Sequence, residues 1–239
     1  MFCKKGERTI NTETVITKQN ACEEETVAAK KIFGVNVYAL LMAACIVAFA
    51  GFVIENVFRL FCIGVIDDRH RLFPFIAEYG IAFSAIFLLF GTPKNMRIFT
   101  KKINITAKNK KTAAFLQTAL YFLIVFLCIG IGEITVGLTV EKTMGIKGWN
   151  FSNIPLHITR YTSIPTDFAY TSAFTLFMHL FFDKMIDALS EISPKVLKIL
   201  AIVLTTTILL DSLVMLCYGM MYNKYPSYWR IVLQFKLKR

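Results

Sequence analysis

Residues 35–58 read VNVYALLMAACIVAFAGFVIENVF, a long apolar stretch that only Asn36, Glu55 and Asn56 interrupt with strongly polar side chains. A helix needs about 20 mainly apolar residues to cross the ~30 Å hydrocarbon core of a bilayer. The stretch meets this requirement, and it therefore predicts a membrane-spanning helix.

Further apolar stretches of similar character follow along the chain. They are Pro74–Gly91, Ala113–Val140, Ile164–Phe182 and Val196–Tyr222. Together with the first stretch they predict an all-α fold, a polytopic membrane helix bundle of about five transmembrane helices. As a helix, Ala113–Val140 would be about 42 Å long, so we expect it to tilt or to project beyond the membrane.

The composition agrees with a membrane protein. Of the 239 residues, 56% are hydrophobic and 22 are Phe, whereas soluble domains contain about 45–50% apolar residues. Three segments are expected on this basis: a polar, flexible cytoplasmic tail at 1–34, a membrane bundle at 35–222, and a basic, interfacial tail at 223–239.

The distribution of Lys and Arg predicts the orientation. The amino-terminal tail contains six and the loop after the second stretch contains seven with no acid, whereas the loops after the first and third stretches contain three each. The amino terminus is therefore expected in the cytoplasm, although the carboxyl tail is also basic. The acid-free loop either contacts anionic lipid headgroups or a partner, or shows only the usual cytoplasmic excess of positive charge.

Several classes of chemistry lack their motifs. The chain has no G-x-x-x-x-G-K-[ST], H-E-x-x-H or G-x-S-x-G sequence, and its six cysteines form no C-x-x-C pair. His157 and His179 are too far apart in sequence to pair on one helix. We therefore expect no cofactor, no metal, no nucleic-acid partner and no catalytic residue that the sequence can identify.

Acidic residues inside or beside the apolar stretches are the informative feature, because such groups usually face a cavity or a partner. They are Glu55, Glu78, Glu133, Glu141, Asp167 and Asp211. Alternating helix directions bring all of them toward the same face of the membrane. Taken singly, an acid near a helix end is also typical of a solvated interface.

The stretch after residue 132 suggests how these acids are used. Glu133, Gly137 and Glu141 are four residues apart and share one helix face. Our hypothesis is that Glu133 faces a polar cavity with Glu55 within about 12 Å, slightly beyond the screening length of exposed charges, while Glu141 lies at the membrane rim. Trp149 would then cap the cavity with Phe151, or both would belong to an interfacial aromatic belt.

Four motifs resemble one known family. GFVIENVF (51–58), EYG (78–80), EITVGLTVEK (133–142) and WNFS (149–152) are similar to the membrane domain shared by CmpB-like proteins, the ABC-transporter type IV family, and the transmembrane protein 229 family. The matching positions are Glu55, Tyr79, Gly80, Glu133, Gly137, Trp149, Asn150 and Ser152. The resemblance covers about 43–189 and implies a membrane fold and, by the family name, transport.

The sequence departs from this family in three places. Asn150 stands where the family commonly has Asp, and Phe151 stands where it commonly has Tyr. Gly132 occupies a position that is a bulky aromatic in animal members. A carboxylate-dependent role at position 150 is therefore not expected.

Three functions remain open from the sequence. A permease-like protein, or its accessory subunit, would handle a small solute, ion or lipid through a carboxylate-lined cavity at one membrane face. The expected cavity residues are Glu55, Glu78, Tyr79, Glu133, Gly137, Trp149, Asn150, Ser152, Asp167 and Asp211. Without an ATP-binding loop, such a protein needs a gradient or a partner such as an ATPase subunit, besides the membrane lipids around it.

The second possibility is a membrane enzyme acting on lipid. Glu133 or Glu55 would be its general base and His157 its acid, while Arg160 would contact a headgroup phosphate or another anion. The third is a structural or assembly protein in which acidic and basic side chains hold helices together. The oligomeric state stays open in all three.

Overall fold

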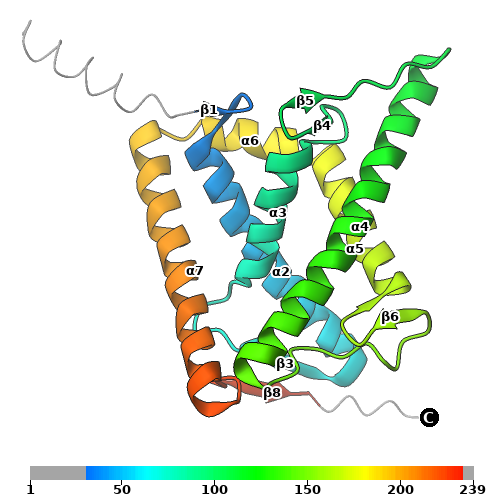
Figure 1. Ribbon diagram of the computed structural model, residues 1–239. Coiled ribbons are helices and arrows are strands. Elements are labelled where there is room, and N and C mark those ends of the chain that lie inside the picture. The colour runs from blue at the N-terminus through cyan, green and yellow to red at the C-terminus, as the bar shows by residue number, and fades with distance from the viewer. Residues whose placement is uncertain (1–30, 234–239) are drawn as a thin grey trace, which may run out of the picture.

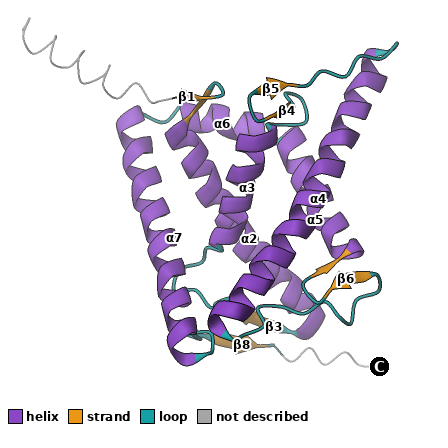
Figure 2. Cartoon of the chain, viewed as in Figure 1, coloured by secondary structure: helices purple, strands orange, loops and turns teal. Residues whose placement is uncertain are grey.

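The structure is a computed structural model that describes residues 31–233, most of which are helical (Figures 1 and 2). The helices are α2 (Val37–Ile63), α3 (Ala77–Phe90), α4 (Lys110–Met144), α5 (Ile164–Leu180), α6 (Phe182–Ser190) and α7 (Pro194–Tyr222). The strands are β1 (Lys31–Ile32), β2 (Val35–Asn36), β3 (Val65–Asp67), β4 (Arg97–Ile98), β5 (Lys101–Lys102), β6 (His157–Thr159), β7 (Thr162–Ser163) and β8 (Arg230–Val232). The predicted all-α bundle is confirmed.

The long helices alternate in direction, as Figure 1 shows. α2, α4 and α7 run one way, and α3 and α5 run back. We call the end that carries β1, β2, β4, β5 and α6 the amino end, and the end that carries β3, β6, β7 and β8 the carboxyl end. The acidic parts of the helices therefore gather near the carboxyl end, and the Lys-rich loop lies at the amino end.

The predicted apolar stretches all form helices, but of different lengths. α2, α4 and α7 are long and apolar enough to cross a membrane by length and composition. α3 has 14 residues, about 21 Å of helix, and α5 has 17. α3 is short because Ile76 before it is extended and Gly91 after it has a φ of 74°, and α5 stops before the chain turns into α6 at Phe182.

Local sequence explains where the longest helices begin and end. Asn36 caps α2 by accepting a hydrogen bond from the backbone N–H of Tyr38 at 2.8 Å, and Asn109 caps α4 in the same way. Gly64 and Gly145 follow the two helices in the left-handed conformation, at φ values of 66° and 68°. Glycine adopts this conformation without strain, which is why each helix ends there.

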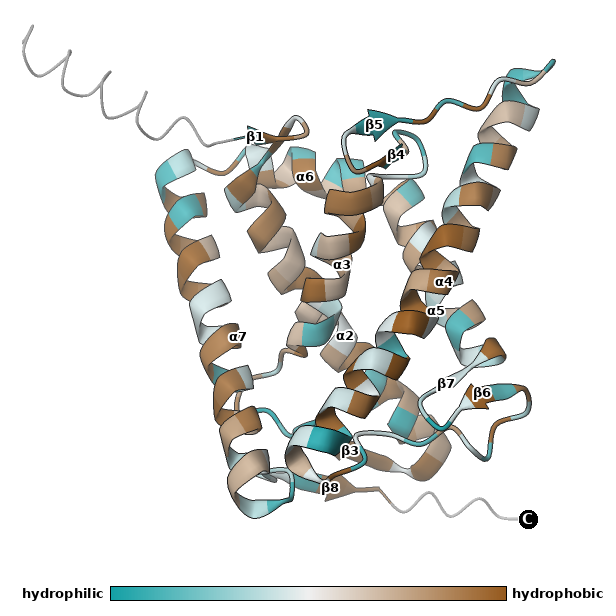
Figure 3. Cartoon of the chain, in the orientation of Figure 1, coloured by the Kyte–Doolittle hydropathy of each residue, from teal (hydrophilic) through white to brown (hydrophobic). Residues whose placement is uncertain are grey.

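The long helices consist mainly of hydrophobic residues (Figure 3), and many of these side chains are exposed. Within the most apolar window of α4 only 11% of the residues are buried in the protein, against 39% for α2 and 22% for α7. Side chains such as Phe61, Phe115 and Met221 are more than two-thirds exposed. Soluble proteins rarely expose so much contiguous apolar surface, so this surface faces lipid.

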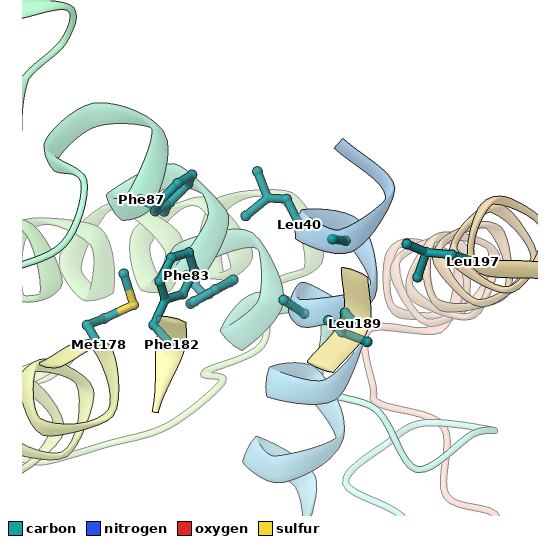
Figure 4. Packing of buried hydrophobic residues seen from close by; sticks show 9 residues of the cluster. Leu40, Phe83, Phe87, Met178, Phe182, Leu189 and Leu197 are labelled. Atoms are coloured by element: carbon teal, nitrogen blue, oxygen red, sulfur yellow. The ribbon is translucent and has the colours of Figure 1, made fainter. Parts of the chain in front are cut away.

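A small core holds the amino end together (Figure 4). Its buried members include Leu40, Phe83, Phe87, Met178, Phe182, Leu189 and Leu197, which come from α2, α3, α5, α6 and α7.

The helices α2 and α3 approach each other closely at Gly80. A Cβ at Gly80 would lie 2.6 Å from the Ala44 carbonyl oxygen. Glycine therefore allows α3 to approach the backbone of α2.

The carboxyl tail, predicted to be an interfacial segment, is paired in its described part. β8 forms an antiparallel pair with β3 in which Asp67 is opposite Arg230. Residues 234–239 lie outside the described chain. The β3–β8 pair closes the carboxyl end between α2 and α7 (Figure 1).

Candidate functional site

The carboxyl end contains a network of charged side chains on the loop after α2. Arg69 Nε donates to Glu55 Oε2 at 2.6 Å, and the Tyr79 hydroxyl donates to the other oxygen of Glu55 at 3.0 Å. Arg59 pairs with Asp67 at 2.6 Å. Glu55 is therefore fully engaged by an arginine and a tyrosine, and it holds the loop to α2.

Gly51 makes the Tyr79 contact possible. It lies one helical turn before Glu55, and a Cβ there would be 2.5 Å from a carbon of the Tyr79 ring. The ring can thus pack closely against α2 while its hydroxyl reaches the carboxylate.

The same arrangement occurs a second time on α4. Gly137 lies one turn before Glu141, and a Cβ at Gly137 would overlap the Tyr161 ring. The Tyr161 hydroxyl donates to Glu141 at 2.6 Å, and Arg160 pairs with Glu141 at 3.0 Å. The pattern Gly-x-x-x-Glu, which occurs in GFVIE and GLTVE, is the sequence signal for both arrangements. It does not identify the tyrosines, which lie far away in the sequence.

Tyr161 is itself held by the loop that precedes it. Trp149 Nε1 donates to the Tyr161 carbonyl at 2.8 Å, and the two rings meet edge to face at 5.7 Å. Burial, followed by the Glu141 carboxylate, raises the pKa of Tyr161, which keeps the hydroxyl a proton donor.

The remaining loop residues of the expected cavity have local contacts. Asn150 accepts a hydrogen bond from the Ser152 backbone N–H at 2.9 Å, which forms a tight turn. Phe151 donates its backbone N–H to the Arg160 carbonyl at 2.7 Å. These contacts order the loop after α4, and the cap that Trp149 and Phe151 would form over a cavity stays a prediction.

The expected anion contact has a different partner. Arg160 is already paired with Glu141, and His157 Nδ1 lies 3.1 Å from the Ile154 carbonyl. Both side chains thus have a partner within the protein, and an anion contact by these two residues stays a prediction.

Glu78 and Asp211 attach the loop after α2 to other helices. Arg71, which is buried, pairs with Glu78 and donates to the Ser212 hydroxyl at 3.0 Å. Asp211 accepts the backbone N–H groups of Leu72 and Phe73, at 2.9 and 3.2 Å. Both acids, Glu78 on α3 and Asp211 on α7, therefore position the loop after α2.

Asp68 was not singled out in the sequence, yet it organises the carboxyl tail. It is 2% exposed and accepts backbone N–H groups from His70 at 2.8 Å, from Trp229 at 2.8 Å and from Tyr228. Because Asp68 lies in a loop, periodicity could not identify it.

Two further acids, Glu133 on α4 and Asp167 on α5, form a pair. Their carboxyls lie next to each other and to Thr162, whose hydroxyl donates to Asp167 Oδ2 at 2.6 Å. Asp167 is 1% exposed, and Gly130 leaves room for it, since a Cβ there would be 2.9 Å from Oδ2.

Each of these carboxyls has one unpartnered oxygen. Among the described residues, Glu133 Oε2 and Asp167 Oδ1 are buried and lack a hydrogen-bond partner, and no Lys or Arg in residues 31–233 forms a salt bridge with either acid. The residues described contain no cluster of three or more His, Cys, Asp and Glu side chains that could hold a metal ion.

Tyr170 lies between this pair and the Glu55 network. Its hydroxyl interacts with that of Tyr79, and it lies within electrostatic range of Glu55 and of Glu133. Tyr170 is therefore near both acids, and a cavity shared by Glu55 and Glu133 stays a prediction.

Comparison with known proteins identifies the family. The family model described as Putative ABC-transporter type IV matches residues 42–216, which run from α2 into α7. The chain belongs to this family. The predicted resemblance to CmpB-like proteins is confirmed, and the match extends beyond the expected 43–189. Searches of curated proteins and of solved structures found no match.

The family and the apolar helices together make the chain a membrane protein of a transporter-type family. The region that matches the family contains both Gly-x-x-x-Glu arrangements and the Glu133–Asp167 pair.

Proposed function

We propose that this chain is the membrane component of a transport system and that Glu133 and Asp167 together bind one monovalent cation, a proton or a small metal ion. The observation that carries the proposal is a pair of adjacent carboxyls on α4 and α5, each with one buried, unpartnered oxygen and neither in a salt bridge with a basic side chain of residues 31–233.

The physics of the pair favours a bound cation. An ionised side chain is costly within a membrane, and two carboxylates that share a site disfavour double ionisation. A shared proton or a bound cation removes one negative charge and satisfies the free oxygens. Transport that is coupled to an ion gradient requires a site that binds and releases such an ion.

Of the ten residues expected to line the cavity, the proposal assigns ion binding to two, Glu133 and Asp167. Glu55 is excluded as the ion site because Arg69 already neutralises it, and Glu78 is paired with Arg71. Tyr79 and Tyr170 lie between Glu55 and the Glu133–Asp167 pair. We propose that they transmit the binding or release of the ion at the pair to the loop after α2. Three further points stay predictions: coupling to an ATPase or another membrane partner, binding of the surrounding lipids, and a cytoplasmic amino terminus.

Ion flux into liposomes tests the function. Protein would be reconstituted with a pH-sensitive dye or a sodium-sensitive dye inside, and a potassium diffusion potential would drive cation entry. We expect Glu133→Gln and Asp167→Asn to lower the flux about tenfold or more, because each removes a charge of the ion site while the amide keeps the shape of the side chain.

Two variants are the controls. Glu141→Gln alters the acid two helical turns farther along α4 that Arg160 already pairs, and Asp187→Asn alters an exposed acid on α6. Both should retain most of the flux. Flux that is equal in wild type, Glu133→Gln and Asp167→Asn would reject the ion site.

A further inference from the structure

A row of polar side chains continues along α5 from the acid pair. Asp167, Thr171, Thr175 and His179 are four residues apart, a spacing that places them on one face of a helix. The first three are 1%, 0% and 6% exposed. The row rises about 18 Å along the helix, more than half of the ~30 Å core.

Each member of the row has a polar atom without a partner. Among the described residues, Asp167 Oδ1, Thr171 Oγ1, Thr175 Oγ1 and His179 Nδ1 are buried and make no hydrogen bond. With Glu133 Oε2, five of the seven buried side-chain atoms that lack a partner in the described chain belong to α4 and α5; the other two are Arg59 Nε and Arg97 Nε.

The two threonines differ from other helical threonines of the chain. The hydroxyls of Thr118, Thr135, Thr139, Thr143 and Thr207 each donate to the carbonyl four residues earlier. Such bonding is the usual way for a threonine in a membrane helix to satisfy its hydroxyl. Thr171 and Thr175 lack it, which leaves their hydroxyls available for another partner.

An open groove meets this row at the half nearer the amino end of the bundle. It lies between the first half of α4 and the second half of α5, where Thr118, Phe122, Thr175 and His179 are among its lining residues. Thr175 and His179 belong to both the groove and the row, so the row reaches the surface of the bundle there.

We propose that the row is a proton path that connects the Glu133–Asp167 pair with the amino end of the bundle, with His179 as its outermost proton acceptor. The inference rests on the proposed function and deepens it, because it identifies the bound ion as a proton. Successive side chains are separated by about 6 Å along the helix, twice the length of a hydrogen bond, so the path requires one bridging water between neighbours.

The chemistry of the row favours a proton over a metal ion. A hydroxyl both donates and accepts hydrogen bonds, and an imidazole exchanges a proton between its two nitrogens. A metal cation needs several oxygen ligands at each position, whereas the row provides one polar side chain per turn. In each transfer, a proton moves to the next oxygen as that group's own proton moves onward, so no oxidant or other reactant is consumed.

Proton arrival at the acid pair tests the path. Full-length protein would be reconstituted in liposomes, a pH jump would be applied from the amino end, and time-resolved infrared absorption would follow the protonated carboxyl band. We expect Thr171→Val, Thr175→Val and His179→Phe each to slow arrival about tenfold, equivalent to about 1.4 kcal/mol in the barrier, with the final band amplitude unchanged.

Matched variants separate this effect from misfolding. Thr171→Ser restores a hydroxyl and should restore the rate, and Thr139→Val, on exposed α4 surface, should change nothing. Wild-type rates in Thr171→Val, Thr175→Val and His179→Phe would overturn the path while leaving the ion site intact, provided that Glu133→Gln still abolishes the band. A band that Glu133→Gln leaves unchanged would overturn the ion site and the path together.

Discussion

Replacing Gly80 with alanine is expected to lower the free energy of unfolding by about 2 kcal/mol, the range found for overpacking. The new Cβ would lie 2.6 Å from the backbone oxygen of Ala44. A backbone oxygen inside a helix cannot rotate away as a side chain can, so α3 would have to separate from α2. Unfolding would be followed by titrating the detergent-solubilised protein with a denaturing detergent.

Gly132→Ala is the matched control. Gly132 is on α4, and the described structure has no atom within 4 Å of a Cβ at this position. Alanine forms helix more readily than glycine by up to about 1 kcal/mol, so this variant should be as stable as wild type or slightly more stable. Equal loss in both variants would show that the α2–α3 approach is not as close as described.

The second large effect concerns the carboxyl tail. Replacing Asp68 with alanine removes the acceptor for three backbone N–H groups, those of His70, Tyr228 and Trp229. Leaving buried donors unsatisfied costs about 1–3 kcal/mol each, so we expect local opening of the β3–β8 pair. A loss of about 3 kcal/mol makes amide exchange about a hundredfold faster, which hydrogen–deuterium exchange of peptides covering 226–233 would detect.

Asp187→Ala, in an exposed position on α6 at the amino end, serves as its control. Exchange at 226–233 should be unchanged in that variant. If Asp68→Ala also left this exchange unchanged, the tail would be held by contacts other than the Asp68 carboxylate.

The bundle could be predicted because its signals are local. Length and hydropathy identify α2, α4 and α7 directly, since a lipid-facing helix needs about 20 apolar residues in a row. The end of α5 could not be predicted from hydropathy, because Phe181 and Phe182 are as apolar as the span itself. The turn into α6 follows from packing, where Phe182 and Leu189 are buried against the other helices.

The end of the bundle at which the acids gather could be predicted from the sequence, but the side chains that they contact could not. Alternating helix directions bring Glu55, Glu133 and Asp167 toward one end, and that reasoning needs only span order. Which acid meets an arginine depends on the path of the loops, and Arg69 and Arg160 both lie in loops without periodicity. The α5 row has a visible spacing, but only the burial and free hydroxyls of Thr171 and Thr175 distinguish it from ordinary helical threonines.

Infrared absorption of the protein in lipid at neutral pH tests the shared ion most directly. We expect one protonated carboxyl band in the wild type, because two adjacent carboxylates cannot both be ionised at low cost. Glu133→Gln and Asp167→Asn should each remove or shift this band, and Glu141→Gln should leave it unchanged. Full ionisation of all carboxyls in the wild type, or a band that survives both Glu133→Gln and Asp167→Asn, would contradict a proton shared by Glu133 and Asp167.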